Sequence, residues 1–202
     1  MTNSRILIHA LLRPNTALLQ TVRTLQYTLG RGLADKKYSN ERKEYNGRKL
    51  VGFSMEQMYQ VVSDVTNYKR FVPFCKKSTV ILESDEEMTA ELQIGFPPIF
   101  ETYLSHITLD RPRLVKAVCK DGRLFKYLET CWKFSEGIES NPQTSIVDFS
   151  IDFEFKSRLH YQLANMFFDA LVKQMESAFL VEAKKRYGIE SIPMHQLSYV
   201  KS

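Results

Sequence analysis

Hydrophobic and polar positions alternate with a period of two through most of the middle of the chain, between residues 76 and 155. The clearest run is 147–155, where Val, Phe, Ile, Phe and Phe alternate with Asp, Ser, Asp and Glu; similar runs cover 88–94 and 128–134. Such alternation is typical of strands with one buried side and one side in water. Short turn-like segments separate the runs, so the pattern predicts an antiparallel meander of about six strands.

A capping-box pattern, Ser54 followed three residues later by Gln57, predicts the start of a short helix. Apolar residues follow at helical spacing and predict that this helix ends near Asn67, with a further helical turn over 68–72. Ahead of it, the charged segment 36–49 gives way to an apolar pair, which predicts a first strand.

A long helix is predicted from Ser157 to Gly188. Ser157 is a suitable N-cap, basic residues lie in the last turn, and Gly188 is a suitable stop. The segment carries too many apolar residues for one narrow stripe, so we expect the strands to cover it.

These elements together predict an α+β fold. A curved antiparallel sheet of about six to seven strands wraps around the long C-terminal helix, with two short helices after the first strand. Two packings fit this pattern, a cavity between sheet and helix or a fully packed core. The 13 Phe and 10 Tyr residues would give a cavity bulky walls.

Three segments differ in composition. Residues 1–34 contain four arginines and no acidic residue, as in a mitochondrial transit peptide, and predict a mature start near Ala34. An N-terminal helix of the folded domain is the alternative. Residues 35–188 are expected to form one domain, and 189–202 a C-terminal tail.

The net charge of +5 lies mostly in the first segment, because 24 basic and 23 acidic residues follow from position 35 onward. The domain itself therefore gives little reason to expect a nucleic-acid partner. The three cysteines, Cys75, Cys119 and Cys131, form no CxxC pair, so we expect reduced, partly buried thiols and neither a disulfide framework nor a zinc site.

No phosphate-binding, dinucleotide-binding, zinc-protease or serine-hydrolase motif occurs in the sequence, and its four histidines are scattered. We therefore expect no catalytic residues, no metal and no enzymatic activity. An enzyme would require a titrating group deep in a cavity, for which Tyr103, His106 and Glu129 are the candidates.

Two apolar features favour a membrane contact or a gate. The turn formed by Phe96, Pro97, Pro98 and Ile99 could touch a membrane, or it could be a buried corner of the sheet. Lys76 and Lys77 follow the apolar segment 71–74, as at a lipid headgroup boundary, although a solvated charge pair is the alternative.

Several motifs occur in a recognisable order: FVPFCKKS (71–78), IGFPP (94–98), VKAV (115–118), LETCW (128–132), VDFSI (147–151), LANMFFD (163–169) and VKQ (172–174). Over residues 38–188 the sequence resembles the mitochondrial coenzyme Q-binding protein family, which belongs to the START-like, helix-grip superfamily. The resemblance implies ubiquinone as a bound ligand and no catalytic cofactor.

The same resemblance implies a non-catalytic ubiquinone carrier or chaperone that supports respiratory electron transport and quinone biosynthesis. It implies a peripheral location on the matrix side of the mitochondrial inner membrane. The expected partners are ubiquinone, the membrane's lipid surface, and proteins of quinone biosynthesis or the respiratory chain, with no nucleic acid. The alternatives are a cyclase- or aromatase-like enzyme acting on a quinone precursor and a ribosome- or protein-binding START-like module.

Candidate ligand contacts follow from the inward-alternating strand positions and the helix faces. For an apolar tail, these are Val62, Phe71, Leu92, Trp132, Phe149, Ile151, Phe153, Leu163, Phe167, Leu171 and Met175. Quinone oxygens only accept hydrogen bonds, so the head group needs donors. The donor candidates are Tyr103, His106 and His160.

Overall fold

The computed structural model describes residues 42–96, 99–119, 125–156 and 158–201, with the backbone alone described at Phe96, Ile99, 158–170 and Lys201. The expected transit peptide and its cleavage near Ala34 lie outside these residues.

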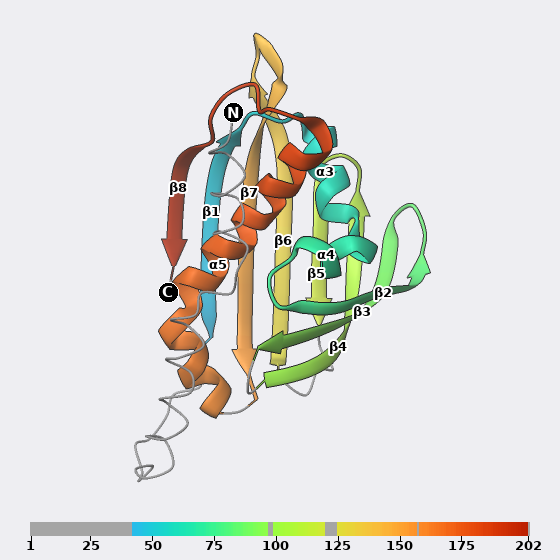
Figure 1. Ribbon diagram of the computed structural model, residues 1–202, viewed down its shortest axis with the longest axis vertical. Helices are drawn as coiled ribbons and strands as arrows, with labels where there is room; N and C mark the ends of the chain where they lie inside the picture. The colour runs from blue at the N-terminus through green and yellow to red at the C-terminus, as the bar shows by residue number, and fades with distance from the viewer. Residues whose placement is uncertain (1–41, 97–98, 120–124, 157, 202) are drawn as a thin grey trace, which may run out of the picture. The chain divides into compact units, whose positions relative to one another are not determined.

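An eight-stranded antiparallel sheet dominates the described part of the chain, with the strand order β2-β3-β4-β5-β6-β7-β1-β8 (Figure 1). The strands are β1 (Lys43–Val51), β2 (Cys75–Glu83), β3 (Glu87–Phe96), β4 (Ile99–Asp110), β5 (Leu114–Cys119), β6 (Phe125–Ile138), β7 (Asn141–Phe155) and β8 (His195–Lys201). From β2 to β7 each strand pairs with the next in sequence, which confirms the predicted meander.

The sheet has one strand more than the upper end of the predicted range, because β8 pairs with β1. This strand lies within 189–202, the segment expected to be a tail. Its side chains from His195 to Val200 are all exposed. A strand without a buried face leaves no hydrophobic alternation to detect.

Among the described residues, four helical segments accompany the sheet: α3 (Met55–Ser63), the 3-10 turn η1 (Val65–Asn67), α4 (Tyr68–Phe71) and α5 (Arg158–Tyr187). The predicted capping box is present, since the Ser54 hydroxyl accepts from the Gln57 backbone N–H and the Gln57 side chain accepts from the Ser54 N–H. Gly188 has a φ of +90°, so the long helix ends at the glycine that the sequence predicted as its stop.

Helix α5 crosses one face of the curved sheet, as Figure 1 shows. A buried ion pair ties its middle to β1: the Lys49 Nζ lies 2.6 Å from Glu176 Oε2, and the Tyr45 hydroxyl donates to the same oxygen at 3.0 Å. Lys49 is 9% exposed and Glu176 is 4% exposed. Buried charges are retained only when paired, so this contact fixes how α5 sits on the sheet.

The core lies between the inner face of the sheet and the helices. The predicted inward set of β7 is confirmed at Val147, Phe149 and Phe153, which are at most 5% exposed. The packing is not complete, however, and a cavity remains next to α5.

Candidate functional site

A cavity of about 140 Å³ lies between the sheet, α5 and the helical segment before β2. Its lining is mostly apolar and comes from three places: Val65, Tyr68, Val72 and Pro73 in the segment before β2; Met175 and Phe179 on α5; and Cys75, Leu92, Ile94, Tyr103, Ser105, Ile107, Val115, Ala117, Cys119, Leu128, Thr130, Trp132 and Phe149 in the sheet. Of the two packings that fit the sequence, the structure has the one with a cavity.

Three residues with hydroxyl groups line this cavity from the sheet, Tyr103 and Ser105 of β4 and Thr130 of β6. Ser105 is only 4% exposed. None of the three hydroxyls has a hydrogen-bond partner in the described part of the chain. Burial raises the pKa of Tyr103, so its hydroxyl keeps its proton and remains a donor. A buried polar group without a partner is costly, and a ligand with acceptor oxygens would satisfy these groups.

The floor of the cavity is aromatic. The rings of Trp132 and Phe149 have centroids 4.2 Å apart, and Phe179 of α5 lies 4.7 Å from the Trp132 ring. Phe179 also makes an edge contact with Tyr68 at 5.4 Å. The cluster therefore connects sheet, α5 and α4 through tilted and edge-to-face contacts, and offers flat surfaces to a ring.

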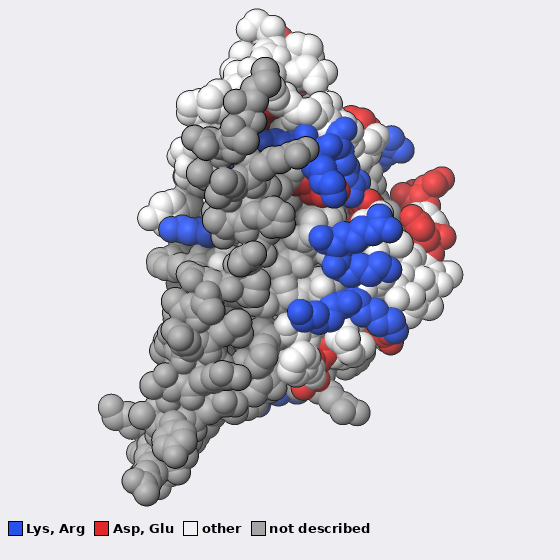
Figure 2. Space-filling view, viewed as in Figure 1, with Lys and Arg blue, Asp and Glu red and all other residues white. Residues whose placement is uncertain are grey.

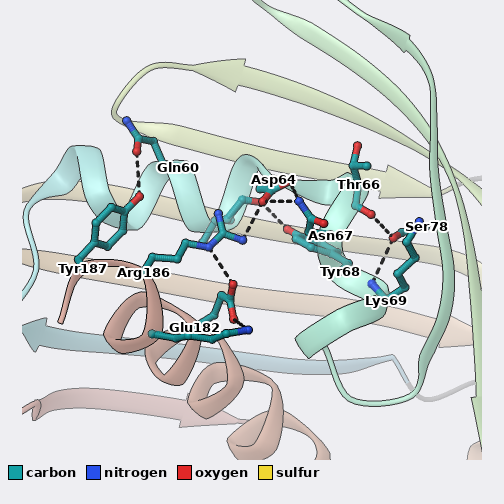
Figure 3. Close-up of polar contacts among 12 residues, drawn as sticks. Gln60, Asp64, Thr66, Asn67, Tyr68, Lys69, Ser78, Glu182, Arg186 and Tyr187 are labelled. Carbon is teal, nitrogen blue, oxygen red and sulfur yellow. Dashed lines mark hydrogen bonds and ion pairs between the residues drawn. The ribbon is translucent and has the colours of Figure 1, made fainter. Parts of the chain in front are cut away.

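Residues 65–73, which we call the helical wall, close the side of the cavity opposite the sheet. Figure 3 shows that the start of this wall is fastened to α5 through Arg186, whose guanidinium lies 2.7 Å from Asp64 and 2.9 Å from Glu182. Ser78 of β2 holds the other side, accepting from the Lys69 backbone N–H and donating to the Thr66 carbonyl. Tyr68 and Phe71 also pack edge-on against Phe179. The wall is thus held by side-chain contacts, and not by continuous strand pairing.

Two thiols also line the cavity, Cys75 and Cys119. Burial raises the pKa of Cys75 to about 11, so this thiol is protonated near neutral pH. A protonated, buried thiol behaves as a small apolar group.

The cavity is lined by five of the predicted contact residues: Leu92, Tyr103, Trp132, Phe149 and Met175. Their position agrees with the prediction, and their contact with a ligand stays a prediction. Leu92, Trp132 and Phe149 come from strands whose inward set the alternation identified, whereas Tyr103 lies on β4 and Met175 on α5.

Five other candidates lie outside the lining. Val62 is fully buried in α3, and Phe71, within the helical wall, packs edge-on against Phe179. Phe153 packs against Phe125 farther along the sheet, and Ile151 and Leu171 are half-buried. Val62, Phe71, Ile151 and Phe153 belong to the core around the cavity or pack against it, and none of the five candidates borders the cavity.

The prediction that His106 faces inward is wrong. Its side chain is exposed on the outer face of β4, next to Thr89. Of the other enzyme candidates, Glu129 pairs with Lys116 at 2.9 Å and accepts from the Tyr127 hydroxyl at 2.6 Å, away from the cavity. Only Tyr103 among those three candidates borders it.

Several candidates fall on side chains that the structure does not describe: His160, Leu163, Phe167, Phe96, Pro97, Pro98 and Ile99. Lys76 and Lys77 are described and exposed. Lys77 lies 2.7 Å from the Glu91 carboxylate, whereas Lys76 has no ion-pair partner among the described residues.

Sequence reasoning missed the hydroxyls of Ser105 and Thr130 and the wall residues Tyr68, Val72 and Pro73. The wall residues carry no periodic signal, since their approach to the sheet is a tertiary contact. Thr130 did belong to a predicted inward set, so the signal was present there. Among the helices of the described residues, none is long and apolar enough to cross a membrane.

Comparison with known proteins gives three kinds of match. The family model described as polyketide cyclase / dehydrase and lipid transport matches residues 51–180. "Coenzyme Q-binding protein COQ10 homolog B, mitochondrial" of Xenopus laevis is 48% identical over 162 residues, which are 80% of this chain and 66% of the frog protein. "Coenzyme Q-binding protein coq10, mitochondrial" of Schizosaccharomyces pombe is 32% identical over 73% of this chain and 90% of the yeast protein.

A bacterial relative has a different name. "Ribosome association toxin RatA" of Escherichia coli is 33% identical over 69% of this chain and 85% of the toxin. Among solved structures, the Zhui aromatase/cyclase from Streptomyces has a TM-score of 0.62 at 14% identity, covering 72% of this chain and 96% of that one. That likeness shows a shared fold.

Proposed function

The chain belongs to the polyketide cyclase / dehydrase and lipid transport family and, within it, to the coenzyme Q-binding proteins; from this premise we propose that it binds ubiquinone in the cavity between the sheet and α5. The observation that carries the proposal is a set of hydroxyls that have no hydrogen-bond partner among the described residues, in an otherwise apolar, aromatic cavity. The match spans about two thirds of the frog relative's length.

The chemistry of a quinone ring fits this lining. Its two carbonyl oxygens are acceptors only, and Tyr103, Ser105 and Thr130 offer hydroxyl donors. The flat ring suits the aromatic floor at Trp132 and Phe149. The redox chemistry belongs to the ligand, so the protein needs no catalytic group of its own.

The size of the cavity limits what it holds in this structure. A cavity of roughly 150 Å³ takes up one benzene molecule, so 140 Å³ is room for about one ring. Ligand pockets typically measure roughly 300–1,000 Å³. An isoprenoid tail therefore requires that the helical wall or α5 move, and each buried methylene would then contribute about 0.8 kcal/mol.

The role proposed is that of a non-catalytic carrier or chaperone, peripheral to the matrix side of the mitochondrial inner membrane. Two relatives carry "mitochondrial" in their names, which supports the compartment. Support for respiratory electron transport and quinone biosynthesis, and contact with proteins of those systems, belong to the same proposal.

The experiment uses the chain's single tryptophan, Trp132, which lies in the cavity floor. Short-tailed ubiquinone should quench its fluorescence with saturation, while an isoprenoid alcohol of equal tail length, which lacks the quinone chromophore, serves as control. Quinone co-purifying with the protein from mitochondria would agree. Linear, non-saturating quenching and an empty purified protein would contradict the proposal.

Association with ribosomes is the second candidate, because the E. coli relative carries that name. The identity to the frog coenzyme Q-binding protein, 48% against 33%, favours the quinone. Sedimentation of the purified chain with ribosomes at two salt concentrations separates the candidates. Stoichiometric binding that persists at physiological salt would favour the ribosome.

A further inference from the structure

The outer side of α4 and the first residues of β2 carry a group of exposed cations, Lys69, Arg70 and Lys76, which we call the basic patch. Figure 2 shows basic side chains gathered over α4 and β2. None of the three side chains has an ion-pair partner among the residues that the structure describes.

Neighbouring cations are neutralised by carboxylates. Lys77 lies 2.7 Å from Glu91, Lys184 lies 2.5 Å from Glu190, and Arg186 is held by Asp64 and Glu182. The basic patch therefore keeps its full charge within a domain that is otherwise nearly neutral. Unpaired like charges brought together repel one another, and an external anion relieves that repulsion.

The patch lies on the back of the helical wall. Tyr68 and Val72, one helical turn apart, both line the cavity. Lys69 and Arg70 lie between them in sequence and are exposed, so they project from the opposite side. A surface that binds these cations therefore touches the outer side of the wall that closes the cavity.

An apolar group accompanies the third cation. A Cβ placed on Gly95 would lie 3.0 Å from the Lys76 Cγ and 2.8 Å from a ring carbon of Phe100, so the lysine stem and the ring lie side by side over this glycine. The Phe100 side chain is 61% exposed. A cation with an exposed aromatic ring beside it suits the boundary between lipid headgroups and acyl chains.

We propose that Lys69, Arg70 and Lys76, with the Phe100 ring, dock the protein on an anionic phospholipid surface so that the helical wall of the cavity faces the bilayer. This inference rests on the proposed function, since a quinone with a long tail resides in a membrane. On this proposal, the ligand enters and leaves the cavity through the helical wall, on the side that faces the bilayer.

A nucleic acid is the competing occupant of a basic surface. Strong electrostatic binding to nucleic acid involves about 6–10 phosphate contacts, whereas this patch supplies three unpaired cations beside an apolar ring. Lipid docking needs fewer charges, since each lysine or arginine at an anionic membrane contributes about fivefold in partitioning.

The test compares two variants of the full chain with the same change of charge. One is Lys69→Gln/Arg70→Gln/Lys76→Gln. The control is Arg48→Gln/Lys133→Gln/Lys156→Gln, whose residues are exposed on or next to β1, β6 and β7, away from the β2 edge of the sheet. Both keep the arginines of residues 1–34, so the contribution of that segment cancels.

Flotation with phosphatidylcholine vesicles, with and without phosphatidylglycerol, measures docking. We expect the patch variant to lose about a hundredfold in partitioning to the anionic vesicles and the control to lose little. Equal losses in the two variants would overturn the proposal. So would equal binding of the natural chain to both kinds of vesicle.

Two further readouts separate the possible failures. Trp132 quenching by short-tailed ubiquinone in detergent should be equal in both variants, and equal quenching shows that the cavity is intact. If quenching is absent even in the natural chain, the proposed function fails, and not the docking proposal. Binding to a labelled RNA is measured in parallel. If the patch variant loses RNA binding and keeps vesicle binding, the docking proposal is wrong.

Discussion

Two buried serines provide a test of the cavity's purpose, because they differ in their hydrogen bonds. Ser105 borders the cavity at 4% exposure with no partner among the described residues, and Ser145 is fully buried with its hydroxyl donating to the Phe53 carbonyl at 2.8 Å. Replacing each by alanine should have opposite consequences for stability and for ligand affinity.

Ser145→Ala breaks a buried hydrogen bond and leaves a carbonyl unpaired, which costs about 1–3 kcal/mol in the free energy of unfolding. At this chain length that is a fall in Tm of roughly 2–12 °C. Ser105→Ala breaks no such bond, so stability should stay the same or rise by up to about 1 kcal/mol. If the Ser105 hydroxyl donates to a quinone oxygen, its loss should weaken quinone binding about fivefold.

The assays are thermal unfolding followed by circular dichroism and titration of Trp132 fluorescence with short-tailed ubiquinone. The expected pattern is a stable Ser105→Ala with weak binding and an unstable Ser145→Ala with normal binding below its Tm. If Ser105→Ala unfolds as early as Ser145→Ala, the hydroxyl has a structural role. Unchanged quinone affinity would refute its role as a donor.

Three other predictions concern the supports of the cavity. Glu176→Gln leaves the Lys49 ammonium buried without a counter-charge and should cost about 3–5 kcal/mol, measured by urea unfolding. Gly47→Ala places a Cβ 2.5 Å from the Tyr45 hydroxyl oxygen, so the ring must move and lose its bond to Glu176, lowering Tm by several degrees. Cys75, with its pKa raised from 9.0 to about 11, should be alkylated about a hundredfold more slowly at pH 8 in the folded chain than in urea, followed by mass spectrometry.

The control for the ion pair is Glu91→Gln, which removes the exposed partner of Lys77 and should cost less than about 1 kcal/mol. An equal cost for both substitutions would contradict the role of burial. For the glycine, a Tyr45→Phe background should reduce the effect of Gly47→Ala, and full additivity would show that the clash is not transmitted through the hydroxyl. Alkylation of Cys75 at the same rate in the folded and unfolded chain would show that its thiol is not protected.

The alternation of β7 was enough to predict its buried face, because Val147, Phe149 and Phe153 are apolar and their neighbours are charged or small. In β4 the same rule failed. The outer set contains Phe100 and Leu104, which are 61% and 42% exposed, whereas the inner set contains the hydroxyls of the cavity. When a strand places polar side chains on its inward face for a ligand, the alternation of hydrophobic and polar residues points to the wrong face as the buried one.

The helical wall shows a second limit. The capping box and helical spacing predicted helices in this region, but the wall borders the cavity through the short helix and turn that follow, Tyr68, Val72 and Pro73. Which side of a four-residue helix faces the sheet depends on anchors outside it, such as Ser78 on the next strand and Arg186, far away in sequence. Local pattern carries no information on such contacts.

The ways in which the walls are fastened indicate which of them opens. The sheet is continuous around the cavity and its strands are paired along their length, so expansion there would break many backbone hydrogen bonds. Helix α5 is fixed at its middle by the buried Lys49–Glu176 pair, whose separation is costly. The helical wall is held by the partly buried Arg186–Asp64 pair, the hydrogen bonds of Ser78, and the packing of Tyr68 and Phe71 against Phe179. These contacts include neither a strand ladder nor a fully buried ion pair. We therefore expect the wall to open at a lower cost than the sheet or α5. Because its outer side carries cations without an ion-pair partner among the described residues, it is also the part that an anionic membrane would hold.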